Sequence, residues 1–200
     1  LSSKTEKNAI LGLCQDMLNE WKVKYKNIGA IIFLRKDLAR DSIEVNFEQF
    51  NTLYNSVELR WSRTEALRLV VWLVNQAVPG FYQEEVAVEV ASQELIERNL
   101  TKLWGVKLGK ITSNEAYSSR WILAALSDFN GQLQARDIIR FLQYATEDAG
   151  RPIYEDRYIM PAEIKKAVPN CSNKKLNEVI QEIAALKPVS YTHLRAHETA

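Results

Sequence analysis

An apolar run at residues 28–34 gives way abruptly to charge at Arg35, and this change constrains the fold more than any other feature. The run is rich in isoleucine and follows residues 5–25, in which apolar side chains recur at helical spacing. A short, continuous apolar segment is typical of a strand that is covered on both faces, as in a parallel sheet. We therefore predict a helix over residues 5–25 and a buried parallel strand over residues 28–34.

Arg35 and Asp37 would then lie at the carboxyl end of that strand, where open α/β sheets bind their ligands. The Arg35 guanidinium is a candidate ligand for an anion, because its planar fork can hold two oxygens of one phosphate. A salt bridge from Arg35 to Asp37 or Asp41 is the alternative. The sequence leaves both interpretations open.

Residues 189–199 read as the translation of a transposon-type adapter used in sequencing libraries. Both histidines of the chain, His193 and His197, lie in this segment, so we do not interpret their spacing as a zinc site and predict no metal ligands. We expect the natural sequence to stop near Pro188. Because the chain starts with Leu1, we also expect it to be an internal fragment of a longer protein.

The formal net charge of +1 predicts no general attraction to nucleic acid or to an acidic membrane surface. No apolar run reaches the roughly 20 residues that a membrane-spanning helix requires, so we expect no membrane partner. Cys14 falls on the apolar face of the first helix and Cys171 falls in a polar turn, which argues against a disulfide framework. A reducing, cytoplasmic location is therefore expected.

Two capping boxes each predict the start of a helix. In this motif a Ser or Thr side chain accepts a hydrogen bond from a first-turn amide, and a Glu three residues later reaches back. The two pairs are Ser62 with Glu65 and Thr112 with Glu115. We expect the first box to open a largely apolar helix that continues to Ala77, and the second to open another helix.

Residues 105–112 imitate a phosphate-binding P-loop. Only three residues separate the two glycines where the motif has four, and one residue intervenes between Lys110 and Thr112. The preceding segment is also predicted to be helical, whereas a strand should lead into such a loop. We therefore predict a turn between helices here.

Three segments together carry a resemblance to a known family. They are Ile31–Asp37 (Ile-Ile-Phe-Leu-Arg-Lys-Asp) after an amphipathic helix, Val57–Trp61 (Val-Glu-Leu-Arg-Trp) before an apolar helix, and Gly131–Arg140 (Gly-Gln-Leu-Gln-Ala-Arg-Asp-Ile-Ile-Arg). This order resembles the second half of bacterial AAA-type P-loop ATPases, notably relatives of the STAND and KAP NTPases. The resemblance covers roughly residues 5–149.

The resemblance implies that Arg35 senses the γ-phosphate of ATP, with Asp37 beside it in the cofactor site. It also implies that Arg136, at the start of a late helix, is the sensor arginine of a helical lid. Arg35 and Arg136 are thus the candidate catalytic residues, and ATP and Mg²⁺ are the implied cofactors. The Walker A and Walker B segments would lie upstream, so the fragment alone is not expected to hydrolyse ATP.

The implied fold is α/β, changing to mostly α along the chain. We expect the end of a P-loop NTPase parallel sheet over residues 1–61, an α-helical lid over residues 62–150 and a small helical tail over residues 151–188. Residues 189–200 would be adapter-derived. An ordinary solvated charge is the alternative for Arg136, and the nearby Arg140 is a further arginine candidate.

The last part of the chain suggests a second hypothesis. Two short helices, residues 161–168 and 173–186, are expected on either side of a turn that contains Pro169, in a helix-turn-helix-like order. Four lysines lie near the turn: Lys165, Lys166, Lys174 and Lys175. A non-enzymatic helical regulatory or DNA-binding module is therefore the alternative function. Acidic residues dilute the charge, so we favour a lid extension or a surface for self-association or a protein partner.

Overall fold

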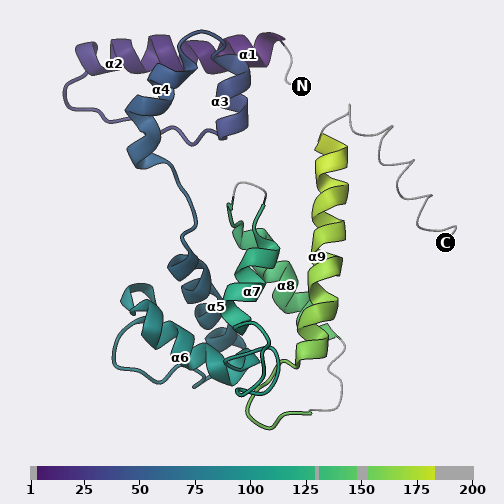
Figure 1. Cartoon of the computed structure of the whole chain (residues 1–200). Helices are drawn as coiled ribbons and strands as arrows, with labels where there is room; N and C mark the ends of the chain where they lie inside the picture. Colours follow the sequence, from purple (N-terminus) through teal and green to yellow (C-terminus); the bar gives the residue numbers. More distant parts are fainter. Residues whose placement is uncertain (1–3, 129–130, 148–152, 183–200) are drawn as a thin grey trace, which may run out of the picture. The chain divides into compact units, whose positions relative to one another are not determined.

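The structure, a computed structural model, describes residues 4–128, 131–147 and 153–182, and every regular element in these ranges is a helix (Figure 1). The chain divides into two compact units, Leu1–Leu59 and Arg60–Ala200. The prediction of an α/β fold that begins with the end of a parallel sheet is wrong, because the described residues form only two isolated β-bridges and no strand. The adapter-like segment and both histidines lie outside the described residues.

The first unit is built from short helices around a small core. The helix predicted over residues 5–25 is confirmed, because α1 (Lys4–Leu11), a π-helical segment (Gly12–Met17) and α2 (Leu18–Lys24) follow one another directly. The unit continues with α3 (Lys36–Ser42), α4 (Phe47–Tyr54) and a 3-10 turn (Asn55–Val57). Its buried residues among those described are Cys14, Ala39, Ser42 and Ile43.

Residues 28–34 join α2 to α3 as an irregular segment, and the buried strand predicted there is absent. Ile31 and Phe33 are 85% and 83% exposed, and no backbone hydrogen bond ties the segment to another described residue. A buried parallel strand needs neighbouring strands to satisfy its N–H and C=O groups. The described chain supplies no such neighbour, so a composition that favours a strand does not produce one.

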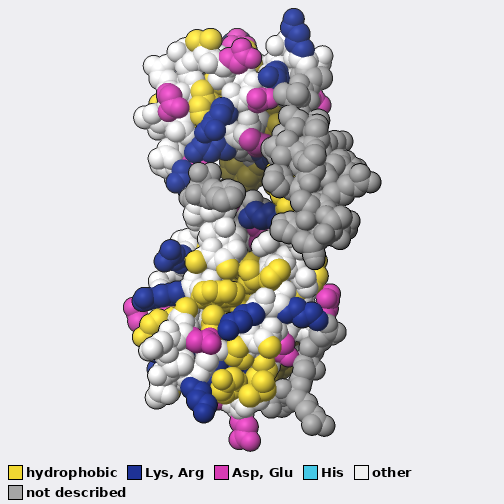
Figure 2. All heavy atoms as spheres, turned by 45° about the vertical axis from the view of Figure 1, so that its right-hand side comes forward, with side chains coloured by type: hydrophobic (Ala, Val, Ile, Leu, Met, Phe, Trp, Pro, Cys, Tyr) yellow, Lys and Arg dark blue, Asp and Glu magenta, His cyan; other side chains and the backbone are white. Residues whose placement is uncertain are grey.

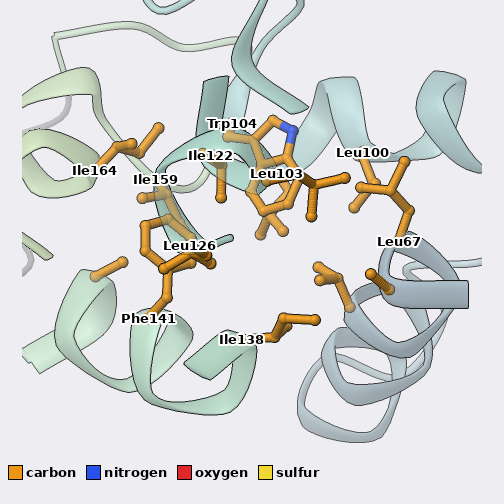
Figure 3. Close-up of a cluster of buried hydrophobic side chains, with 14 of the residues drawn as sticks. Leu67, Leu100, Leu103, Trp104, Ile122, Leu126, Ile138, Phe141, Ile159 and Ile164 are labelled. Atoms are coloured by element: carbon orange, nitrogen blue, oxygen red, sulfur yellow. The ribbon is translucent and has the colours of Figure 1, made fainter. Parts of the chain in front are cut away.

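The second unit has one hydrophobic core to which five helices contribute. These are α5 (Arg63–Ala77), α6 (Gln93–Trp104), α7 (Ser118–Leu126), α8 (Ala135–Glu147) and α9 (Pro161–Glu182), with a 3-10 turn at Val88–Val90. Their apolar side chains point toward one another in Figure 3. The residues labelled there are Leu67, Leu100, Leu103, Trp104, Ile122, Leu126, Ile138, Phe141, Ile159 and Ile164. Within this unit α8 packs along α9 and α5 packs against α6.

Of the two predicted capping boxes, the one at Ser62 forms and the one at Thr112 does not. At the start of α5 both reciprocal hydrogen bonds form, from the Glu65 amide to Ser62 Oγ at 3.2 Å and from the Ser62 amide to Glu65 Oε2 at 2.8 Å. The helix predicted after Thr112 is wrong, because residues 106–118 turn back on themselves and α7 starts only at Ser118. The Glu115 amide, which the capping box would pair with Thr112, donates instead to Ser113 Oγ at 3.4 Å.

The predicted helix-turn-helix order at the end of the chain is also wrong. One helix, α9, runs through Pro169 without a turn, and it starts at Pro161, where a proline favours helix initiation. Ile164, Ala167 and Cys171 are all buried. They lie on one helical face, so burial on both sides of Pro169 keeps the helix continuous despite the hydrogen bond that the proline removes.

Candidate functional site

Arg35 lies immediately before α3 and forms a two-pronged ion pair with Asp37. Its Nη2 donates to Asp37 Oδ2 at 2.7 Å and its Nε donates to Asp37 Oδ1 at 3.1 Å. Both side chains are more than half exposed. The hydrogen bonds from Arg35 hold the pKa of Asp37 below its ordinary value. The salt-bridge interpretation is therefore confirmed for Asp37, although the pair does not stand at the end of a strand.

Arg136 lies in the first turn of α8, at the helix start that the sequence predicted. Its side chain is 56% exposed. One guanidinium nitrogen donates to Gln134 Oε1 at 3.2 Å, and another lies 3.5 Å from Glu178 Oε2 on α9. Arg136 belongs to the second unit and Arg35 to the first, so each is described within its own unit.

Arg140, one turn further along α8, holds the same carboxylate more closely. Its Nη1 donates to Glu178 Oε2 at 2.9 Å, and its Nη2 donates to the other oxygen, Oε1. The Arg140 side chain is only 17% exposed. The hydrogen bonds from Arg140 lower the pKa of Glu178, and the same contact raises the pKa of Arg140. The sequence pattern singled out both arginines and placed Glu178 among the acidic residues that dilute the charge of the last part of the chain. It did not predict the pairing, because Glu178 lies 38 residues away along the chain from Arg140.

Asp137 is the buried member of this contact between α8 and α9. It is 1% exposed, and its Oδ2 accepts a hydrogen bond from Lys175 Nζ at 2.7 Å. Its other oxygen, Oδ1, has no hydrogen-bond partner among the described residues, and a guanidinium nitrogen of Arg140 lies 3.9 Å from it. The Cys171 thiol donates to the Asp137 carbonyl at 3.4 Å, and burial raises the pKa of this thiol. Cys171 is thus a buried helix residue and not the turn residue that the sequence predicted.

The described side chains around Asp137 and Glu178, between α8 and α9, carry more positive than negative charge. Among the described side chains that pair with or act on Asp137 and Glu178, the cations are Arg136, Arg140, Lys174 and Lys175, so four positive charges surround two negative ones. Lys174 belongs to the group because it lies close enough to lower the pKa of Glu178. An excess of two positive charges, with two guanidinium groups one helical turn apart, is suited to binding a multivalent anion.

The lysines proposed for DNA binding do not form one basic surface. Lys175 binds the buried Asp137, and Lys165 Nζ lies 3.6 Å from Glu115 Oε1. On the face of the second unit seen in Figure 2, basic side chains are scattered among hydrophobic and acidic ones. Without the predicted turn there is also no separate recognition helix in the described part of α9.

The segment that imitates a P-loop is organised around Arg157. This buried guanidinium donates to the carbonyl of Lys107 at 2.8 Å and to the carbonyls of Trp104 and Gly109, both at 3.4 Å. A phosphate cradle presents backbone N–H groups to its ligand, whereas this loop presents C=O groups to a cation. The loop therefore has the opposite polarity to a phosphate site.

Comparison with known proteins does not assign the chain to a family. No family model, no curated protein and no solved structure matches it. The described residues contain no group of three or more His, Cys, Asp or Glu side chains placed to hold a metal ion. Among the helices of the described ranges, none combines the length and the apolar composition that crossing a membrane requires.

Proposed function

We propose that this chain is a fragment of an ATP-binding and ATP-hydrolysing protein, to which it contributes arginines that bind the phosphates of ATP. The observation that carries the proposal is the placement of Arg136, which presents an exposed guanidinium in the first turn of α8. The resemblance to AAA-type ATPases requires an arginine at the start of a late lid helix, and α8 starts at Ala135.

Arg136 can exchange its present partners for phosphate at low cost. Ion pairs on an exposed surface contribute about 0–1 kcal/mol, and the contact of Arg136 with Glu178 is long, at 3.5 Å. A guanidinium can instead make two parallel hydrogen bonds to one phosphate group, which are stronger than bonds between neutral groups.

The roles of Arg35 and Asp37 rest on the resemblance alone. Phosphate binding by Arg35 would require it to release Asp37, which it now holds through two hydrogen bonds. The proposal for this chain covers phosphate binding by its arginines, and Mg²⁺ is implied by the resemblance alone. Bound ATP would supply the γ-phosphoryl group for transfer, and the arginines would stabilise negative charge on its oxygens.

The test is calorimetric titration of the chain with ATP at low ionic strength, comparing the wild type with Arg136→Met. We expect weak binding, with a dissociation constant of about 1 mM, and a roughly tenfold loss in Arg136→Met, as the removal of one charge-assisted contact predicts. Arg120→Met is the matched control, because Arg120 is also an exposed arginine at the start of a helix, over the Tyr117 ring. Equal ATP affinities in wild type and Arg136→Met would contradict the proposal.

A further inference from the structure

We propose that Glu178 occupies a phosphate-binding site formed by Arg136 and Arg140, so that α9 and a ligand phosphate compete for α8. This inference rests on the proposed function, because it concerns the regulation of the same arginine. The competing ligand class is a multivalent phosphate, such as the polyphosphate part of a nucleotide. The contact would thus be autoinhibitory.

The Glu178 carboxylate is held in the way that a phosphate group would be. Both of its oxygens accept hydrogen bonds from Arg140, and one of them also lies 3.5 Å from Arg136. Two guanidiniums one turn apart on α8 therefore converge on a single anionic group that comes from another helix. A phosphate group presents oxygens of the same kind and carries more charge, so it can replace the carboxylate on the same donors.

The charges around Glu178 also favour a multivalent anion. Lys175 pairs with the buried Asp137, whereas Glu178 is the carboxylate that Arg136 and Arg140 share. With both carboxylates in place, the described side chains around Asp137 and Glu178 still include two more cations than anions. A ligand with two or more negative charges would neutralise this excess of positive charge more completely than the single Glu178 carboxylate does.

The part of α9 that carries Glu178 is only shallowly buried. Cys171 is the last buried residue of this helix in the part for which side chains are described, and residues 172–180 are exposed or half-buried. This part of α9 is held to α8 by the ion pairs of Lys175 and Glu178. Pro169 also removes one hydrogen bond from the helix just before it. Attachment by charge, without deep apolar burial, is what a competing anion can release.

The test uses inorganic pyrophosphate as the probe and compares Glu178→Gln with the wild type at low ionic strength. We expect Glu178→Gln to bind pyrophosphate about tenfold more tightly, because its neutral amide competes less well for the guanidiniums. Glu155→Gln is the matched control, because it changes the net charge by the same amount at an exposed residue outside the contact between α8 and α9. Its affinity for pyrophosphate should equal that of the wild type. The double variant that combines Glu178→Gln with Arg140→Met should lose this gain in pyrophosphate affinity.

A second measurement does not depend on how well the variants fold. Saturating pyrophosphate should speed hydrogen exchange of the wild-type amides at residues 173–180 and leave those of α6 unchanged. Equal pyrophosphate affinity in Glu178→Gln and wild type would overturn the inference, as would unchanged exchange in α9 at saturation. These outcomes can be told apart from the outcome of the ATP titration of Arg136→Met. Loss of ATP binding in Arg136→Met with no effect of Glu178→Gln would leave the proposed function standing and remove only the autoinhibitory contact.

Discussion

Gly105 and Arg157 make a contact that leaves no room for a side chain at residue 105. Gly105 has φ 73° and ψ 164°, a conformation that is essentially restricted to glycine. A Cβ atom there would lie 2.2 Å from Cζ of Arg157. Because this guanidinium is buried and holds the carbonyls of the following loop, it cannot move aside without breaking those hydrogen bonds.

We therefore expect Gly105→Ala to lower the free energy of unfolding by about 3 kcal/mol or more, from backbone strain and the displaced guanidinium together. Gly131→Ala is the control, because Gly131 also has positive φ, 71°, but a Cβ atom added there would meet no described atom within 4 Å. It should cost only about 1 kcal/mol. Urea unfolding of both variants measures the difference, and equal losses would show that the contact with Arg157 is unimportant.

At the scale of elements, the continuity of α9 through Pro169 predicts an unusual effect of removing a proline. A proline in a helix interior costs about 3 kcal/mol relative to alanine. Pro169→Ala should therefore stabilise the protein by about 1–3 kcal/mol, measured by urea unfolding. Pro161→Ala, at the first residue of the same helix, should change stability little. If Pro169 instead stood in a turn, its replacement would leave stability unchanged or reduce it.

The contact between α8 and α9 should also depend on pH through Glu178. Arg140 lowers the pKa of this carboxyl from its ordinary value of 4.5. A lowered folded-state pKa means that the interaction stabilises the fold above pH 4.5 and is lost as the pH falls through the lowered value. The wild type should thus be more stable than Glu178→Gln near neutral pH, and this difference should shrink in acid. Urea unfolding of both proteins across that pH range tests it, and a difference independent of pH would contradict it.

For the whole molecule, the two units should differ greatly in stability. The core of the second unit contains large side chains such as Trp104 and Phe141, whereas few described residues of the first unit are buried and several large apolar ones are exposed. Buried apolar area is the main source of stability. We expect the slowest amides of α2 to exchange on the order of 100-fold faster than those of α6, as measured by native-state hydrogen exchange. Equal protection of both helices would contradict this expectation.

The sequence by itself determined most of the helices, because helical hydrogen bonds and caps join residues only three or four positions apart. The capping box at Ser62, the apolar spacing of residues 5–25 and the proline at the start of α9 all predicted what the structure contains. The start of α8 at Ala135, and with it the place of Arg136 in the candidate site, followed from the same local pattern.

Only the tertiary structure decided which of these local preferences prevailed and which charges meet. Residues 28–34 form no strand because a strand depends on neighbours that the described chain does not supply. The segments predicted as two helices on either side of Pro169 form the single helix α9, because side chains before and after this proline are buried on the same face. The partners of Arg140 and Arg157 lie 38 and 50 residues away along the chain, in Glu178 and in the Lys107 carbonyl. Side-chain spacing within one helix carries no information about contacts at that distance, since packing of whole helices brings them together.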